Sequence, residues 1–333
     1  LLEFNAVSVA SAVNMSAELK TILSDLHSST GGNEKDASRK AKGCVIALFN
    51  FMEQNLTSSS IEIHLCDAFR GEYNILECLS IKRSEFLDAK ASALESIYNL
   101  MESYFEIFRS FVIDVKNFCM LTYSQSSSRV LPLSLKLLTL IVQNCAHPEI
   151  QVDIEPITLF EKFFNELVKT PSATVMKELG RFLGALVRYY PEVVSQRGDR
   201  LYKRIIEIIQ AEKKNKQHMI SIVGCLSAID GILFNYPPDH TGNQVSELYE
   251  LIKWCVNSNM KERKNGKGVI SEALLIIWHH APLVGEHLFQ DWLFFTLNLN
   301  ELGKDRVLKY MCVNASESFM HVIAEKISSV GEK

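Results

Sequence analysis

Proline and glycine are scarce in this chain. Eight prolines and fifteen glycines are spread over 333 residues, which favours long uninterrupted helices over a fold rich in turns. No run of about 18 apolar residues occurs, so we expect no membrane span. The net charge of −4 argues against a surface that is basic throughout. Any binding of nucleic acid must therefore come from local basic patches.

The eight cysteines lack the spacing of metal or disulfide sites. No C-x-x-C pair occurs, and most cysteines have apolar neighbours, as in the segments VGCLSAI and KNFCMLTY. Disulfide frameworks are typical of secreted proteins, and the mildly apolar start LLEFNAVSVASAV lacks the basic leading segment that would indicate a signal peptide. We therefore expect reduced, buried cysteines in a cytosolic or nuclear protein.

Catalytic and ligand-binding motifs are missing as well. There is no G-x-S-x-G, no glycine-rich kinase loop, no H-R-D or D-F-G triplet and no H-E-x-x-H. The segment MKERKNGKGVISEALLIIWHHAP (260–282) has glycines around Lys267, but it lacks the first glycine and the Ser or Thr of a phosphate-binding loop. On a helix, the adjacent His279 and His280 would point about 100° apart and could not bind one ion together. We predict no catalytic, metal or cofactor site in this chain.

Helical periodicity, by contrast, runs through the whole sequence. Between Val175 and Tyr190, apolar residues recur at every third or fourth position, as in a helix that buries one face. Pro171 and Ser172 suit the first turn of this helix, and Pro191 is expected to mark its end. The segment therefore predicts an amphipathic helix with defined ends.

Comparable helices recur with a period of about 44 residues. Their expected starts are Asp36, Ser84, Ser128, Pro171, Lys216, Met260 and Lys304. Each interval has room for one further helix, and two-helix units of about 40–47 residues are the signature of HEAT-like or armadillo-like arrays. An amphipathic pair buries its apolar face by stacking on its neighbours. We predict an all-α, HEAT/armadillo-like helical-repeat solenoid (α-α superhelix), with a non-repetitive all-helical domain as the alternative.

Two segments of different character make up the predicted array. Residues 1–60 are expected to hold N-terminal helices with a flexible loop at 27–40, where the polar segment HSSTGGNEKDASRK lies. Residues 61–333 are expected to hold HEAT-like repeats that continue beyond this sequence. Small residues in the second helices of the units should let stacked helices approach closely, namely Gly180, Gly184, Gly224 and Ala273.

Basic residues cluster in two of the predicted turns between the helices of a unit. They are Lys213, Lys214, Lys216, Lys261, Arg263, Lys264 and Lys267. In a stack of units, equivalent turns line up along one edge, and such a row would neutralise duplex phosphates without reading bases. The competing interpretation is that the exposed turns of any solenoid carry charge.

Several long segments resemble the N-terminal repeats of the DNA-dependent protein kinase catalytic subunit family, within the phosphatidylinositol 3-kinase-related kinases. They are YNILECLSIKRSEFLDAKASALESIYNLMESYFEIF, LPLSLKLLTLIVQN, ITLFEKFFNELVKTPSATVMKELGRFLGALVRYYPEVV, VGCLSAIDGILFNY and VNASESFMHVIAEKI. Each segment alone is an apolar pattern. Their shared order and spacing, from about Cys66 to Ile327, make the resemblance specific.

The resemblance implies a HEAT-repeat arm of a much larger nuclear serine/threonine protein kinase. In that family the arm binds double-stranded DNA ends and meets the Ku heterodimer during non-homologous end joining. The kinase domain, with its ATP and magnesium, lies far downstream and outside this chain. Vertebrate members carry a lysine- and arginine-rich turn near residue 125, whereas this sequence reads YSQSSSRV and leaves only Arg129. The DNA contact is then either absent from this turn or carried by the later basic turns.

We therefore expect a nuclear binding scaffold that is not itself an enzyme. Its expected partners are double-stranded DNA ends, the Ku heterodimer and the remainder of the parent kinase chain, with no membrane. The expected contacts to the DNA backbone are Lys213, Lys214, Lys216, Lys261, Arg263, Lys264, Lys267 and Arg129. The alternative is a purely protein-binding solenoid, either another giant-kinase arm or a transport adaptor. A small enzyme on a helical frame would need convergent titratable groups that the sequence does not show.

Overall fold

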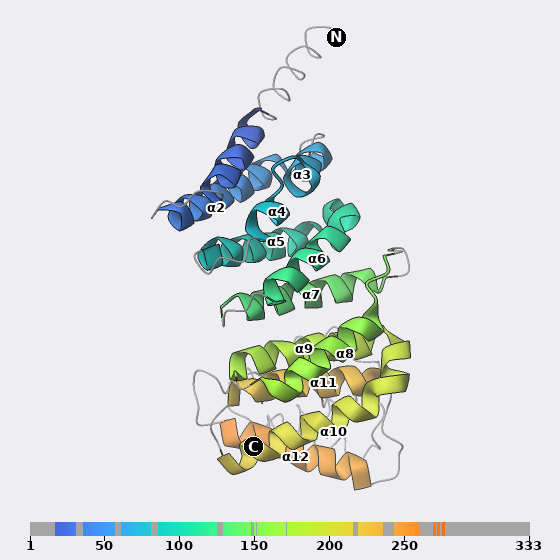
Figure 1. Ribbon diagram of the computed structural model, residues 1–333. Helices are drawn as coiled ribbons and strands as arrows, with labels where there is room; N and C mark the ends of the chain where they lie inside the picture. The colour runs from blue at the N-terminus through green and yellow to red at the C-terminus, as the bar shows by residue number, and fades with distance from the viewer. Residues whose placement is uncertain are drawn as a thin grey trace, which may run out of the picture. The chain divides into compact units, whose positions relative to one another are not determined.

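The computed structural model describes residues 17–30, 36–56, 61–80, 86–124, 129–147, 150, 152–170, 172–215, 219–235, 243–259, 269–270, 272–273 and 275–276. Within these ranges the secondary structure is helical and contains no strand, which confirms the predicted all-α helical-repeat fold (Figure 1). The helices are α2 (Ala37–Asn55), α3 (Ile61–Arg70), α4 (Ile75–Ser80), α5 (Leu87–Phe108), the 3-10 helix η2 (Arg109–Phe111), α6 (Val112–Ser124), α7 (Val130–Cys145), α8 (Pro156–Lys169), α9 (Ala173–Tyr189), α10 (Pro191–Asn215), α11 (Met219–Asn235) and α12 (Asn243–Asn259).

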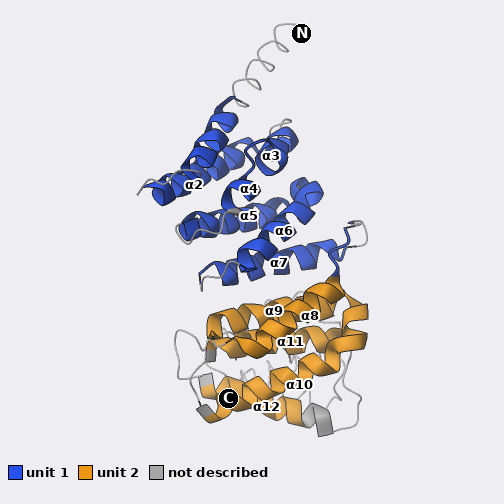
Figure 2. Ribbon diagram, in the orientation of Figure 1, with its two compact units in different colours: residues 1–155 blue, residues 156–333 orange. Residues whose placement is uncertain are grey.

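Two compact units make up the chain, residues 1–155 and 156–333 (Figure 2). In the first unit α5 packs against both α2 and α7, and α6 packs against α7. In the second unit α9 packs against α8 and, most extensively, against α11, while α10 contacts α8, α9 and α11. The sequence predicted a different boundary, at residue 60, where the helical repeats were expected to begin. That boundary stays a prediction.

Helix starts recur at regular intervals along the chain. The helices α2, α5, α7, α9 and α11 begin at residues 37, 87, 130, 173 and 219, so successive starts are 50, 43, 43 and 46 residues apart. From α5 onward one long helix follows each of these starts before the next, namely α6, α8 and α10. Pairs of helices at this spacing are the arrangement that HEAT-like units adopt.

The amphipathic helix predicted after Pro171 is α9. Ser172 has an extended backbone, and its side chain accepts a hydrogen bond from the Val175 N–H at 3.4 Å, which caps the helix. The predicted apolar face is buried from Val175 to Val187. Pro191 follows the end of α9 as predicted, and it is also the first residue of α10, a position where proline loses no hydrogen bond.

Glycines bring the backbones of α9 and α11 into contact. A methyl group on Gly180 would lie 2.5 Å from the backbone of Gly224, and one on Gly184 would lie 2.6 Å from the carbonyl oxygen of Ser227. Side-chain carbons are not tolerated at such distances without movement of the backbone. The close approach predicted from Gly180, Gly184 and Gly224 is confirmed, and Gly231 on α11, which the sequence analysis missed, faces Gly184 in the same way.

The loop predicted at residues 27–40 is wrong at both of its ends. Residues 17–30 are helical, and α2 already begins at Ala37. At the first end, the Thr30 hydroxyl donates to the His27 carbonyl oxygen at 3.0 Å, and the His27 ring packs on Tyr73 with centroids 4.7 Å apart. At the second end, the Lys40 N–H donates to the Asp36 carbonyl oxygen at 2.9 Å. These local bonds extend helices into a polar segment whose composition suggested a turn.

The described cysteines form no disulfide with one another, and most are buried as expected. The buried ones are Cys78, Cys119, Cys145, Cys225 and Cys255, whereas Cys44 is half-buried and Cys66 is exposed. Burial raises the pKa of Cys78 and of Cys145 to about 11, so these thiols stay protonated at neutral pH. In the described part of the chain, no helix combines the length and the apolar character needed to cross a membrane.

Candidate nucleic-acid interface

The structure describes only some of the predicted DNA contacts. Outside the described residues lie Lys216, Lys261, Arg263, Lys264 and Lys267, whose placement stays a prediction. Lys213 and Lys214 are exposed in the last turn of α10, in the second unit. Arg129 immediately precedes α7, in the first unit. The structure therefore brings Lys213 and Lys214 together and assigns Arg129 to a separate unit.

Ion pairs and hydrogen bonds align α10 with α8. Near the start of both helices, Arg197 and Arg200 donate to the carboxylate of Glu161, at 2.9 Å for Arg200. Further along, Arg204 donates to the carbonyl oxygen of Val168 at 3.5 Å. Hydrogen bonds to both guanidinium groups lower the pKa of Glu161 below its usual range, Arg197 contributing most. Because residue numbers rise together along the two helices, α8 and α10 run in the same direction.

The basic end of α10 reaches beyond the end of α8. Val168 is the penultimate residue of α8, whereas α10 continues for 11 residues after Arg204. At a rise of 1.5 Å per residue, this extension is about 16 Å long. The side chains of Ile208 and Ile209 are buried on the inner face of this extension, and Lys213 and Lys214 are exposed at its end. The two ammonium groups therefore stand at the tip of a supported helix.

The end of α10 lies beside the end of α12, as Figure 1 also shows. The Lys213 ammonium lies over the ring of Trp254, 5.6 Å from its centroid, and Trp254 is five residues before the last residue of α12. Earlier along the two helices, burial and then the Glu247 carboxylate raise the pKa of Tyr202. The ends of α10 and α12 therefore lie side by side. The alignment of the turns that follow them stays a prediction, because the basic segment 260–267 lies outside the described residues.

Arg129 is engaged in a different way. It forms an ion pair with Asp88, near the start of α5, and the two side chains are 64% and 52% exposed. The carboxylate offsets the positive charge of the guanidinium, so Arg129 offers little attraction to a phosphate. Its contact joins α5 to α7, two helices that pack on each other. A polyanion would therefore meet a weaker field here than at the end of α10.

Lys169 is a candidate contact that the sequence analysis missed. It is exposed in the last turn of α8 and precedes Lys213 by 44 residues. One helical repeat earlier, Lys169 thus occupies the position that Lys213 occupies at the end of α10. A search for clusters of basic residues overlooks a single lysine between Val168 and Thr170, whereas a comparison at the repeat period finds it.

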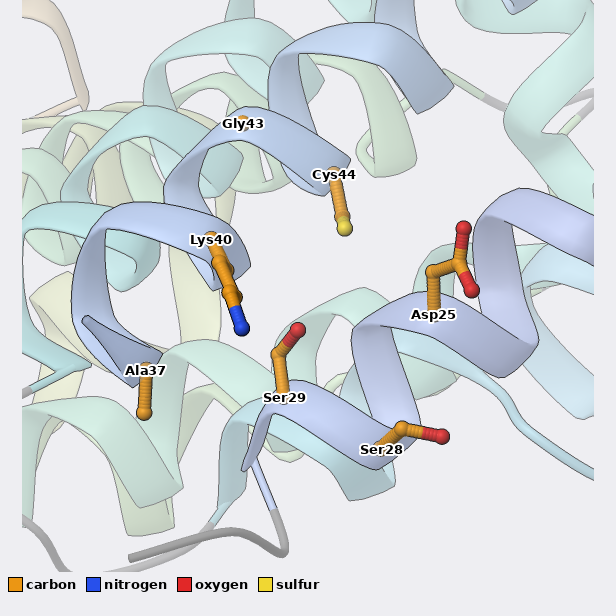
Figure 3. Close-up of a pocket in the computed structure, with 7 residues that line it drawn as sticks. All are labelled: Asp25, Ser28, Ser29, Ala37, Lys40, Gly43 and Cys44. Atoms are coloured by element: carbon orange, nitrogen blue, oxygen red, sulfur yellow. The ribbon is translucent and has the colours of Figure 1, made fainter. Parts of the chain in front are cut away.

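The first unit contains a polar pocket of about 470 Å³ between residues 17–30 and α2 (Figure 3). It is lined by Asp25, Ser28, Ser29, Ala37, Lys40, Gly43 and Cys44. In Figure 3 the side chains of Lys40 and Ser29 point toward each other, and the Cys44 thiol projects between the two helices. Burial, and then the Asp25 carboxylate, raise the pKa of Cys44, so its thiol is a poor nucleophile at neutral pH.

The arrangement of this pocket does not amount to an active site. Among the described residues that line it, none is a histidine that could act as a base toward the thiol. A second pocket of about 460 Å³ is lined by Asp25, Asp67 and Glu72 among others. Within the part of the chain that the structure describes, His, Cys, Asp and Glu form no group of three or more that could hold a metal ion.

Comparison with known proteins identifies the family. Residues 69–333 match the model of the family described as DNA-PKcs, N-terminal. The chain belongs to this family. It is 22% identical over 309 residues to the DNA-dependent protein kinase catalytic subunit of Xenopus laevis, a match that covers 88% of this chain and 7% of that relative. The resemblance expected from the sequence is confirmed, and the chain spans a small part of the length of a DNA-PKcs relative.

Proposed function

We propose that this chain is the N-terminal helical-repeat arm of a DNA-dependent serine/threonine protein kinase, a scaffold that is not itself an enzyme and that binds double-stranded DNA ends. The observation that carries the proposal is the DNA-PKcs family match over residues 69–333. The arm also binds the Ku heterodimer and acts in the nucleus, in non-homologous end joining. The kinase domain, with its ATP and magnesium, belongs to the remainder of the parent chain.

The proposed contact with DNA is electrostatic and independent of sequence. Lys169, Lys213 and Lys214 are exposed at the ends of α8 and α10, and the basic segment 260–267 follows α12. Each lysine that neutralises a phosphate releases condensed counterions, so the logarithm of the binding constant falls by about 0.9 per contact for each unit in the logarithm of salt concentration. Lysines without base contacts hold the duplex without selecting a sequence.

Charge reversal at the end of α10 tests this contact. In Lys213→Glu with Lys214→Glu, we expect weaker binding to every duplex alike and a salt slope reduced by about 1.8, since two phosphate contacts are lost. The matched control is Lys20→Glu with Lys162→Glu, which changes the net charge equally at two exposed lysines outside α10. The same assay applies to charge reversal at Lys261, Arg263 and Lys264.

Two results would count against the proposal. An equal loss of affinity in the control pair would mean that net charge, and not these turns, governs binding. No measurable duplex affinity at low salt would favour the protein-binding solenoid, in which the arm meets protein partners alone.

A further inference from the structure

Most of the described cations in the second unit are paired with a carboxylate, and Lys213 differs from them. Arg188 pairs with Asp230 at 2.8 Å, and Lys253 pairs with Glu250 at 3.1 Å. Lys213 instead lies over the ring of Trp254, and among the described residues it forms no ion pair. An aromatic ring attracts a cation through its quadrupole and carries no net charge. The ring therefore orients the ammonium and leaves its positive charge in place.

This difference matters for a phosphate ligand. A carboxylate that holds a cation also competes with a phosphate for it, as Asp88 does at Arg129. A ring contacts one side of the ammonium, and the remaining N–H donors of lysine stay directed to solvent. The neighbouring Glu212 is buried, so it presents little of its carboxylate to solvent beside Lys213. Burial first, and then Cys255 and the Glu212 carboxylate, raise the pKa of the core thiol of Cys225.

The position of Lys213 on the helix gives the ring a second role. The last turns of α10 extend about 16 Å beyond the end of α8 at 1.5 Å per residue. Ile208, Ile209 and Glu212 are buried on this extension, whereas Lys213 and Lys214 are exposed in its last turn, and the last turn is the part of a helix that frays most readily. Trp254 is half-buried on α12 and meets the terminal turn of α10. The contact therefore ties the tip of α10 to the helix from whose end the basic segment 260–267 continues.

We propose that Trp254 is a positioning residue for the DNA interface: its ring holds the Lys213 ammonium and the end of α10 beside α12, so that the charge of Lys213 stays directed to a phosphate backbone. The inference rests on the proposed function, because the position of Lys213 matters only if the chain binds a duplex. The ligand is the phosphate backbone of double-stranded DNA.

Two readouts on the 333-residue chain test this role, with and without DNA. Without DNA, amide hydrogen exchange of residues 208–215 should be faster in Trp254→Leu than in the wild type, and Trp254→Phe should restore slow exchange by keeping an aromatic ring. With a blunt duplex, Trp254→Leu should weaken binding several-fold and reduce the salt slope by about 0.9, the loss of one phosphate contact. Lys253→Gln, which removes a different cation from α12, is the control and should change neither quantity.

A double-mutant comparison separates positioning from general damage. Once Lys213→Gln has removed the cation, adding Trp254→Leu should not reduce the salt slope further. Unchanged exchange and salt slope in Trp254→Leu, with a reduced slope in Lys213→Gln, would overturn the positioning role and leave the proposed function intact. Faster exchange in Trp254→Leu, with no duplex binding by the wild type even at low salt, would retain the contact and overturn the DNA interface itself.

Discussion

In the second unit α9 and α11 meet backbone to backbone, whereas in the first unit α5 and α7 pack through their side chains. Gly180 and Gly184 on α9 face Gly224 and Gly231 on α11. The helices α5 and α7 contain no glycine, and they bury large side chains instead, such as Leu94 on α5. Two neighbouring helices can thus be stacked either by removing side chains from the contact or by interlocking them.

The two kinds of packing differ in whether they leave room for a buried side chain between the two helices. The first unit buries several polar side chains in its core, among them Lys90 on α5 and the pair Thr122 and Ser134, whose hydroxyl oxygens are 3.0 Å apart. A contact between side chains leaves room for such groups when their hydrogen bonds are satisfied. At its glycines the contact of α9 with α11 leaves no room for a side chain, so it fixes one register of the two helices. The buried polar residues of these helices, Glu178 and Ser221, lie at other positions. We expect the glycine contact to tolerate substitution least.

The largest expected effect is at Gly224. An alanine methyl there would overlap the carbonyl oxygen of Lys177, so α9 and α11 would have to separate. We expect Gly224→Ala to lower the free energy of unfolding by about 3 kcal/mol, the upper part of the usual range for overpacking. Urea unfolding monitored by circular dichroism measures the change.

The matched control for this substitution is Gly43→Ala in α2. An added methyl at Gly43 has no atom within 4 Å, and alanine favours a helix interior by about 0.8–1 kcal/mol over glycine. We therefore expect a small gain in stability. An equal loss in both variants would show that the backbone contact of α9 with α11 has no special role.

The second prediction concerns pH and the buried Lys90, whose residue is 1% exposed. Burial lowers the pKa of Lys90 in the folded state, while the unfolded state keeps a value of about 10.4. Between these two values the unfolded chain binds more protons, so stability should rise with pH, by at most about 1.4 kcal/mol per pH unit. Lys90→Met should remove this rise. A parallel pH dependence of unfolding in the wild type and the variant would contradict the assignment.

A smaller effect is expected at Ser134. Its hydroxyl meets that of Thr122, which also donates toward the Phe118 and Cys119 carbonyl oxygens at 2.8 and 3.0 Å. Because Thr122 retains these acceptors, Ser134→Ala should lower the free energy of unfolding by only about 1 kcal/mol. Combined with Thr122→Val it should lower stability by less than the sum of the two changes, as a double-mutant cycle would show.

The smallest effect is expected at the exposed pair of Arg129 and Asp88. Exposed ion pairs contribute about 0–1 kcal/mol, so Arg129→Ala should change the thermal unfolding midpoint very little. Because Asp88 already offsets its charge, the same variant should also leave the salt slope of duplex binding almost unchanged. A slope reduced as much as in Lys213→Gln would place a DNA contact at Arg129 after all.

The sequence predicted those features that depend on local patterns. Ser172 and the flanking prolines located α9, and the recurring helix starts revealed the two-helix period. The pattern failed at residues 27–30 and 37–40, which are helical. Ser and Gly signal a turn, whereas His27 and Thr30 continue a helix through contacts with a distant residue and with the backbone.

The candidate site was predictable only in part. Clustered lysines located the end of α10. The contacts that decide whether a cation keeps its charge available for a phosphate were not visible in the sequence. Each joins residues 41 apart, Arg129 to Asp88 and Lys213 to Trp254. Such contacts depend on how neighbouring helical repeats pack on each other. The apolar periodicity of a single helix does not determine that packing. Lys169 was missed for a related reason, since its position matters only in comparison with the next unit.

The most direct test of the account is the salt dependence of duplex binding by the wild-type chain. The three exposed lysines at the ends of α8 and α10, Lys169, Lys213 and Lys214, predict a straight line of the logarithm of the binding constant against that of salt, with a slope of at least about 2.7 in magnitude. The slope should be the same for duplexes of unrelated sequence. Absence of binding at the lowest salt concentration, or an affinity that ignores salt, would contradict the account.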